Sequence, residues 1–283
     1  MDDPSTPDLR ALHARLGRVW HQPLPVASFT NKRATVNDRV PVEQVRRLLP
    51  KAVEVDEIDA TGLGMVSMCA CDFWVTRIGP VPMPRVHTNE MLCRISVRIR
   101  KRGRTNRAYY TLRSDSSSRF IGTLGGRFSH FRKRISHFTK REDGRTYELT
   151  CRADDEISGG RLSIDLSALS KQPPTTTIFP SVEAATDFVL QLDGSCGYDY
   201  DSDRLSLQII GYPPWNTQFC HGYEFNFNLL DFLFAEFSLD AELDHVLFME
   251  NTPQTWGASF LYPPEQGARS LEPASVALTP ASE

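Results

Sequence analysis

The stretch from residue 86 to residue 115, VHTNEMLCRISVRIRKRGRTNRAYYTLRSD, carries the alternation that predicts the fold. Apolar residues take every second position in its first half: Cys93, Ile95, Val97 and Ile99. Arginines take positions between them: Arg94, Arg98 and Arg100. Because side chains alternate between the two faces of a strand, one face is apolar and the other is basic and solvated. A turn at KRGRTN, residues 101–106, makes the stretch a long antiparallel hairpin.

Segments on both sides of this hairpin predict further strands. Residues 51–78 alternate around a glycine-containing turn and indicate two strands. Residues 137–154 indicate a second hairpin that turns at Asp143 and Gly144. Residues 195–264 return to an alternating, aromatic-rich pattern, which is also typical of strands.

Three segments have helical spacing or caps. Residues 40–50 place apolar side chains on one helical face and end at Pro50. Residues 116–135 begin with serines and continue with a helical pattern that three glycines weaken. Residues 181–192 begin with Ser181 as the N-cap of a helix. Strands dominate, so the sequence predicts a single α+β domain with two or three flanking helices.

Length and composition agree with one globular domain that has flexible ends. The chain has 283 residues, of which 40% are hydrophobic and 24% are charged, close to the averages for globular proteins. We expect a largely flexible N-terminal segment over residues 1–26, a domain over residues 27–264, and a flexible tail over residues 265–283. No apolar run is long enough for a membrane span and the N-terminus is acidic, so we expect a cytoplasmic protein with no membrane partner.

The charge of the chain is unevenly distributed. Residues 85–152 contain 18 Lys and Arg against 5 Asp and Glu, although the net charge of the whole chain is −3. A basic region with interleaved aromatic residues raises nucleic acid as a partner. The pI near 6.2 and the lack of a known nucleic-acid-binding motif argue against this alternative.

Metal and cofactor motifs are missing from the sequence. The seven histidines and six cysteines form no zinc or redox spacing, and we predict neither a metal nor a cofactor. Cys69 and Cys71 lie two apart on one face of an expected strand, and we interpret them as ordinary buried thiols. No hydrolase elbow, phosphate-binding loop or dinucleotide fingerprint is present.

Several motifs occur in a fixed order between Ala27 and Pro264. They are LLP (48–50), EVDEID (54–59), VSMCACDFWVTRIGPVPMP (66–84), TNEMLCRISVRIRKRGR (88–104), AYYTLRSDSSSR (108–119) and the distal DGS, PPW, HVLF and Trp256. Together they resemble the YqjF-like domain-of-unknown-function family of the acetoacetate decarboxylase-like superfamily. The resemblance implies antiparallel sheets that curl into a cone or barrel around a central apolar pocket.

The resemblance also implies candidate site residues. In characterised decarboxylases of this superfamily, a lysine of a Pro-Lys-Lys turn forms a Schiff base with a β-keto acid, and a glutamate and an arginine position the substrate. Glu90 in HTNEM matches the glutamate, and the arginine falls near Asn31, Lys32 or Arg33. Lys133 in HFRKR lies near the lysine position but lacks the proline, and another alignment puts Ser129, His130 or Phe131 there.

The residues themselves leave the role of Lys133 open. An attacking amine must be unprotonated, and neighbouring cations favour that state. On a helix, however, Arg132, Lys133 and Arg134 point in three directions, which favours a solvated basic face. Glu90 is a functional candidate if it points inward, and it is ordinary if it points outward.

Further candidate ligand contacts are Asn89, Arg33, Tyr110, His221 and Trp215. Core packing is the alternative for the aromatic face around His221 and for Trp215.

Two functions follow for such a domain. The first is a non-catalytic protein that binds a small organic acid or keto compound, which the missing Pro-Lys-Lys motif favours. The second is a lyase that acts on a β-keto acid through a Schiff base at Lys133, with Glu90 positioning the substrate. A homo-oligomer is compatible with either.

Overall fold

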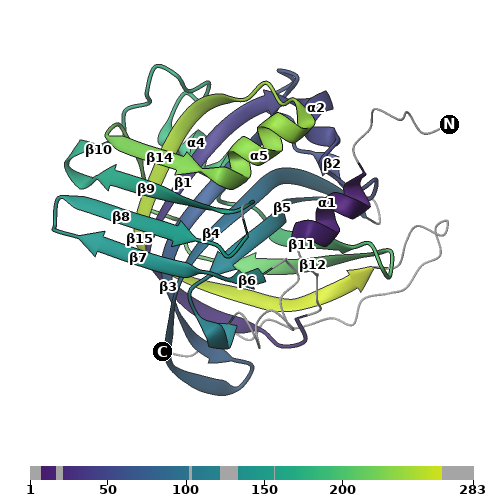
Figure 1. Cartoon of the computed structure of the whole chain (residues 1–283), viewed down its shortest axis with the longest axis horizontal. Coiled ribbons are helices and arrows are strands. Elements are labelled where there is room, and N and C mark those ends of the chain that lie inside the picture. The colour runs from purple at the N-terminus through teal and green to yellow at the C-terminus, as the bar shows by residue number, and fades with distance from the viewer. Residues whose placement is uncertain (1–7, 17–21, 102–103, 122–132, 156, 263–283) are drawn as a thin grey trace.

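Two sheets and a few helices make up the part of the chain that the computed structural model describes (Figure 1). This part consists of residues 8–16, 22–101, 104–121, 133–155 and 157–262. The prediction of a single α+β domain rich in strands is confirmed.

The larger sheet contains eleven of the described strands. They are β1 (Val26–Pro41), β2 (Glu54–Val55), β3 (Leu63–Ile78), β4 (Val81–Lys101), β5 (Arg104–Ser116), β6 (Lys133–Ile135), β10 (Leu169–Ser170), β11 (Gly194–Asp199), β12 (Arg204–Gly211), β13 (Thr217–Cys220) and β15 (Glu242–Tyr262). The main path runs β1-β3-β4-β5-β11-β12-β15-β13-β10. Because β15 also pairs with β1, the sheet curls back on itself.

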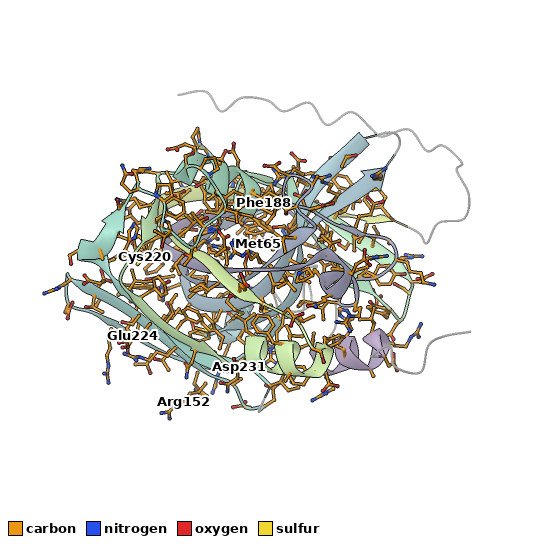
Figure 2. The ribbon with its side chains drawn as sticks, turned by 90° about the horizontal axis from the view of Figure 1, so that it is seen from above. Met65, Arg152, Phe188, Cys220, Glu224 and Asp231 are labelled. Atoms are coloured by element: carbon orange, nitrogen blue, oxygen red, sulfur yellow. The ribbon has the colours of Figure 1, made fainter. Side chains whose placement is uncertain are left out.

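The smaller sheet has four of the described strands in the order β14-β9-β8-β7. Their bounds are β7 (His137–Glu142), β8 (Thr146–Arg152), β9 (Gly159–Asp165) and β14 (Tyr223–Phe227). The predicted turn between β7 and β8 is confirmed, since Gly144 has a φ of +83° and the Asp143 carboxylate accepts the backbone N–H of Thr146 at 2.7 Å. Arg152 and Glu224 project outward from this sheet, whereas Met65 lies inside the molecule (Figure 2).

Short helices close the remaining faces. They are α1 (Leu9–Leu16), α2 (Val42–Arg46), the 3₁₀ turn η2 (Leu166–Ala168), α4 (Val182–Val189) and α5 (Asn228–Phe237). Ser181 caps α4 as predicted, because its hydroxyl accepts the backbone N–H of Ala184 at 3.2 Å. One face of α5, which includes Leu229, Leu230 and Leu233, is buried in the main core together with residues of both sheets.

The predicted hairpin is the pair β4–β5, whose described residues pair from Glu90 with Ser116 to Lys101 with Arg104. The side chains at odd positions in β4, such as Ile95 and Val97, enter the main core. Those at even positions face the other way, and three of them, Glu90, Leu92 and Arg94, line the inside of the curled sheet. The expectation of a solvated arginine face is therefore wrong at Arg94, which is only 3% exposed.

Four further elements differ from the sequence expectations. Residues 133–135 form the strand β6, parallel to β5, in place of the end of a helix. Residues 228–237 form α5 in place of a strand, because their leucines follow a helical period after the alternation of β14 ends. Residues 9–16, within the segment expected to be flexible, form α1 and bury Leu12 and Leu16. The short strand β2 pairs with β4 and not with β3.

Acidic residues from outside the basic stretch neutralise many of its cations. Asp56 accepts hydrogen bonds from Arg98 at 2.5 Å and from Arg107 at 2.7 Å. Asp155 pairs with Arg113 and Arg134, and Asp72 pairs with Lys140. Five cations of the basic stretch are thus paired with three carboxylates from outside it.

The pair of Arg113 with Asp115 is buried, and the removal of one partner should destabilise the protein strongly. The Asp115 carboxylate accepts two hydrogen bonds from Arg113, at 2.7 and 2.9 Å, and one each from Ser136 and Ser158. Asp115→Ala leaves a guanidinium that is 1% exposed without its main partner, so we expect a loss of about 3–5 kcal/mol in the free energy of unfolding, measured in urea. Glu54→Ala, which removes the exposed partner of Arg100, should cost less than about 1 kcal/mol. Equal effects would contradict this account.

The raised pKa of Asp38, a buried residue of β1, predicts that the stability of the protein depends on pH. Burial, and then the charge of Asp244, raise the pKa of Asp38 from 3.8 to about 7. A raised folded-state pKa means that the native state holds this proton more tightly, so stability falls as the pH rises from about 4 to about 7. Relative to Asp38→Asn, the unfolding free energy of the native protein should drop by about 2–3 kcal/mol between about pH 5 and pH 8. Parallel urea midpoints for the two proteins over this range would disprove the assignment.

Candidate functional site

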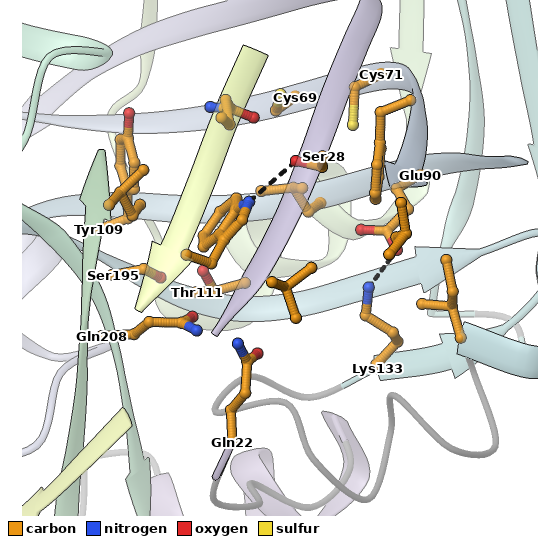
Figure 3. A pocket seen from close by; sticks show the side chains of 18 of the residues that line it. Gln22, Ser28, Cys69, Cys71, Glu90, Tyr109, Thr111, Lys133, Ser195 and Gln208 are labelled. Atoms are coloured by element: carbon orange, nitrogen blue, oxygen red, sulfur yellow. Dashed lines mark hydrogen bonds and ion pairs between the residues drawn. The ribbon is translucent and has the colours of Figure 1, made fainter. Parts of the chain in front are cut away.

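A cavity of about 310 Å³ lies inside the curl of the large sheet (Figure 3). Strands β1, β3, β4, β5, β6, β11, β12 and β15 all contribute to its wall. Most of the wall is apolar, through Leu24, Val26, Phe73, Val75, Ile78, Leu92, Phe120, Ile121, Ile210 and Trp256. Few polar groups among apolar walls are typical of a site for a small organic molecule.

Lys133 and Glu90 meet in this cavity (Figure 3). Lys133 is at the start of β6, and its neighbour on β5 is Ser114. Glu90 is on β4, one strand further along, and its carboxylate accepts a hydrogen bond from the Ser114 hydroxyl at 3.2 Å and from the Lys133 ammonium group. The side chains of Lys133 and Glu90 are only 5% and 3% exposed, so the two charges neutralise each other away from bulk water.

Two arginines also line the cavity. Arg33 on β1 donates to Gln254 Oε1 at 3.1 Å, and Arg94 on β4 donates to the carbonyl oxygen of Val189 at 3.2 Å. The Nε atoms of both are buried and have no hydrogen-bond partner among the described residues. The two guanidinium groups lie over aromatic rings, Arg33 at 5.0 Å from the centre of Trp215 and Arg94 at 4.1 Å from that of Tyr109.

The other candidate ligand contacts do not line the cavity. Asn89 and Tyr110 are on the opposite faces of β4 and β5 from Glu90 and Tyr109, and Tyr110 is buried in the main core. His221 is exposed at a turn, and its Nε2 lies 3.1 Å from the carbonyl oxygen of Gln172. Trp215 lies behind Arg33 and supports its guanidinium group.

Three groups of residues line the cavity although the sequence did not predict it: an N-terminal segment, two polar residues of distant strands, and a pair of cysteines. Gln22, Pro23 and Leu24 come from the segment that we expected to be flexible. The Gln22 backbone N–H donates to the Ser259 hydroxyl at 2.7 Å, which fixes this segment to β15. Polar groups also enter from distant strands, through Ser195 and Gln208. No local pattern marks these residues, since only the curling of the sheet brings them together.

Cys69 and Cys71 complete the polar part of the wall. Their spacing of two residues is the signal that could have placed both on the inner face of β3.

The described residues contain no group of three or more His, Cys, Asp and Glu side chains that could hold a metal ion. Among the described helices, none has the length and apolar character needed to cross a membrane.

No family model matches the chain, and no curated protein matches it. Solved structures do. An acetoacetate decarboxylase-like enzyme from Sphingomonas wittichii RW1 is 13% identical, with a TM-score of 0.56 over 86% of this chain and 94% of that one. The acetoacetate decarboxylase of Legionella pneumophila is 10% identical, with a TM-score of 0.54 over 84% of this chain and 87% of that one. The enduracididine biosynthesis enzyme MppR, in complex with pyruvate, is 14% identical, with a TM-score of 0.53 over 85% of this chain and 91% of that one.

The chain has the acetoacetate decarboxylase-like fold. The curled sheet around an apolar cavity agrees with the architecture that the resemblance implied. Identities of this size show the fold alone, and the narrower resemblance to the YqjF-like family stays a prediction.

The burial of the Lys133–Glu90 pair in this cavity predicts a specific pattern of stabilities. Glu90→Leu leaves a buried ammonium group without its acid, so we expect a loss of about 3–5 kcal/mol in the free energy of unfolding. Adding Lys133→Met removes the unpaired charge, and the double variant should come within about 1 kcal/mol of the native protein. Urea unfolding of the two single variants and the double variant measures this coupling. Additive losses would show that the two side chains do not act as a pair.

Proposed function

We propose that this protein is a lyase that binds a small keto acid in the apolar cavity and forms a Schiff base with it through Lys133. The observation that carries the proposal is the burial of the Lys133 amino group inside the cavity, in contact with Glu90. The missing Pro-Lys-Lys motif favoured a non-catalytic binding protein. Lys133 nevertheless starts a strand and lines the cavity, in place of the solvated helical position that the sequence suggested.

The contact with Glu90 supplies the proton transfer that amine catalysis needs. A lysine attacks a carbonyl carbon only as the neutral amine. Transfer of one proton from Lys133 to Glu90 converts the ion pair into a neutral amine and a neutral carboxylic acid. Between apolar walls such a neutral pair is less costly to bury than separated charges are.

A carboxylate on the substrate would meet the arginines. Arg33 and Arg94 bring two buried positive charges to the cavity, and the described carboxylate that lines it, Glu90, is already occupied by Lys133. An arginine binds a carboxylate through parallel hydrogen bonds, and each Nε here is available for one. The presence of pyruvate in the similar enzyme MppR is consistent with an acid of this size.

The proposed reaction balances with water as the co-reactant. The amine of Lys133 adds to the carbonyl carbon of a β-keto acid, and the carbonyl oxygen leaves as water to give an iminium ion. The bond to the carboxylate breaks, carbon dioxide leaves, and its electron pair passes into the iminium ion to form an enamine. The proton of Glu90 leaves with that water, so the proton that adds to the enamine carbon comes from a solvent water molecule, whose hydroxide combines with the carbon dioxide as bicarbonate. A second water molecule then hydrolyses the iminium ion to a ketone and the free amine, and the proton that this step releases returns to Glu90.

The cytoplasmic location and the homo-oligomer stay predictions. The nucleic-acid alternative is not proposed, because so many cations of residues 85–152 are paired with carboxylates.

Trapping with sodium borohydride tests the proposed function. The protein is incubated with acetoacetate, and separately with pyruvate, then reduced and digested, and the modified lysine is located by mass spectrometry. We expect one reduced adduct, on Lys133, and release of carbon dioxide from acetoacetate before reduction. Because the adduct requires a primary amine in the cavity, Lys133→Met should abolish both signals.

Lys140→Met is the matched control. Lys140 also pairs with an acid, Asp72, but does not line the cavity, so this variant should keep the adduct on Lys133. Keto-acid binding without any adduct would favour the non-catalytic protein, and an adduct without release of carbon dioxide would keep the Schiff base but reject the decarboxylation.

A further inference from the structure

Cys69 lies on the cavity wall between two arginines. In β3 it is opposite Thr35 of β1 on one side and Leu92 of β4 on the other. Arg33 and Arg94 are each two residues from these partners and therefore on the same face. Arg33 is directly opposite Cys71 and diagonal to Cys69, and Arg94 is diagonal to Cys69 on the other side. Diagonal neighbours of this kind are about 7–8 Å apart, which is within reach of a long side chain. All three side chains, Arg33, Cys69 and Arg94, line the cavity.

The charges around Cys69 do not balance within the described part of the chain. Arg33 and Arg94 are 6% and 3% exposed. Arg33 forms hydrogen bonds with the amide oxygen of Gln254 and with Cys71, and Arg94 forms them with the backbone carbonyl of Val189 and with Tyr109; none of these partners is a carboxylate. Each also keeps a buried Nε without a partner. Glu90 and Lys133 neutralise each other, so two positive charges remain in an apolar cavity. Such charges require an anion nearby.

We propose that Cys69 is a second nucleophile of the cavity, a thiolate held between Arg33 and Arg94 that forms a covalent bond with small acids bearing an electrophilic carbon. One guanidinium charge is then balanced by the thiolate and the other by the carboxylate of the ligand. The proposal depends on the arginines and not on amine chemistry at Lys133.

The neighbouring thiol supports this assignment. A hydrogen bond with Cys71 is the largest influence on Cys69; burial opposes it, and the charges of Arg33 and Arg94 add to it, so that the pKa of Cys69 falls from 9.0 to about 5. The same hydrogen bond and burial raise the pKa of Cys71 well above 9.0, so Cys71 keeps its proton and donates it. Burial raises the pKa of Cys93, on the opposite face of β4, to about 12. The other ionisable groups that line the cavity are Glu90, Tyr109, Lys133 and Tyr212.

The covalent step balances without an external oxidant. With an α,β-unsaturated keto acid, the sulfur of Cys69 bonds to the β-carbon and the carbon–carbon π electrons move to the carbonyl oxygen as an enolate. Water then protonates the α-carbon and leaves hydroxide. With an α-halo acid, the carbon–sulfur bond forms as the halide leaves with its electron pair. A carboxylate in either ligand would bind the arginine that the thiolate leaves unbalanced.

Alkylation with iodoacetate tests the proposal. At about pH 6, a thiol with a pKa near 5 is mostly thiolate, whereas an ordinary thiol is about 0.3% thiolate. The lower nucleophilicity of the weaker base offsets part of this difference, so we expect Cys69 to react about tenfold faster than an ordinary thiol at this pH. Peptide mapping by mass spectrometry should show carboxymethylation at Cys69, with Cys93 unmodified as the matched control. Iodoacetate should also react faster than the uncharged iodoacetamide, since the arginines attract its carboxylate.

Arg94→Met tests the cause, because it keeps the length of the side chain and removes its charge. Alkylation of Cys69 at about pH 6 should fall about tenfold in this variant, and Arg94→Lys should restore part of the rate. The ultraviolet absorption of the thiolate, measured as the difference between the native protein and Cys69→Ser, should be present at neutral pH. This second measurement does not depend on access of a reagent.

Some outcomes overturn the proposal. Cys69 that stays unmodified in the native protein, or reacts no faster than an ordinary thiol and shows no thiolate absorption, rules out a nucleophile at this position. The test is independent of the proposed lyase, because carboxymethylation and the borohydride adduct are mapped at different residues of the native protein. A borohydride adduct on Lys133 of the native protein together with an inert Cys69 would reject this inference alone.

Discussion

The pairing of β15 with both β12 and β1 is the constraint on which the cavity depends. Without the contact to β1, the inner faces of β3 and β4 would form one side of an open sheet, and Glu90 and Arg94 would meet water. With it, side chains from strands at the two ends of the chain, such as Arg33 and Gln254, lie within hydrogen-bond distance. The backbone hydrogen bonds of the curled sheet thus set the low polarity in which the buried charges interact.

Buried charges on the two faces of this sheet are compensated in two ways. Arg113 and Asp115, on the face away from the cavity, form a structural pair whose carboxylate also accepts hydrogen bonds from two serine hydroxyl groups. Lys133 and Glu90 form an equally buried pair, but their neighbours are apolar cavity walls and only one hydroxyl, that of Ser114. A buried pair of this kind is often no more stabilising than apolar residues of the same volume. Its presence in a cavity is therefore better explained by chemistry than by stability.

The local pattern of the sequence was sufficient for the β4–β5 hairpin, because alternation and a turn are properties of neighbouring residues. It left the direction of Glu90 open, since alternation places Glu90 on the same strand face as Arg94 and Arg98. It was not sufficient for Lys133. The run Arg132, Lys133, Arg134 fits a solvated helix as well as a strand, and only the parallel pairing of β6 with β5 turns Lys133 inward. The prediction that Arg94 is exposed was wrong for a related reason. The same face of β4 lines the cavity at one end and reaches the surface at the other, and sequence alternation does not tell how deeply each residue of a face is buried.

The two nucleophiles that we propose have opposite electrostatic needs, and their surroundings differ accordingly. An amine becomes reactive when it loses a proton, so a carboxylate beside Lys133 serves as the acceptor. A thiol becomes reactive when its anion is stabilised, so guanidinium groups suit Cys69. Exchanging these neighbours would inactivate both, because arginines would offer the amine no acceptor and a carboxylate would repel a thiolate. Four residues of spacing along β4, from Glu90 to Arg94, correspond to about 13 Å of strand. One strand therefore provides an acidic and a basic environment at separate places in the same cavity.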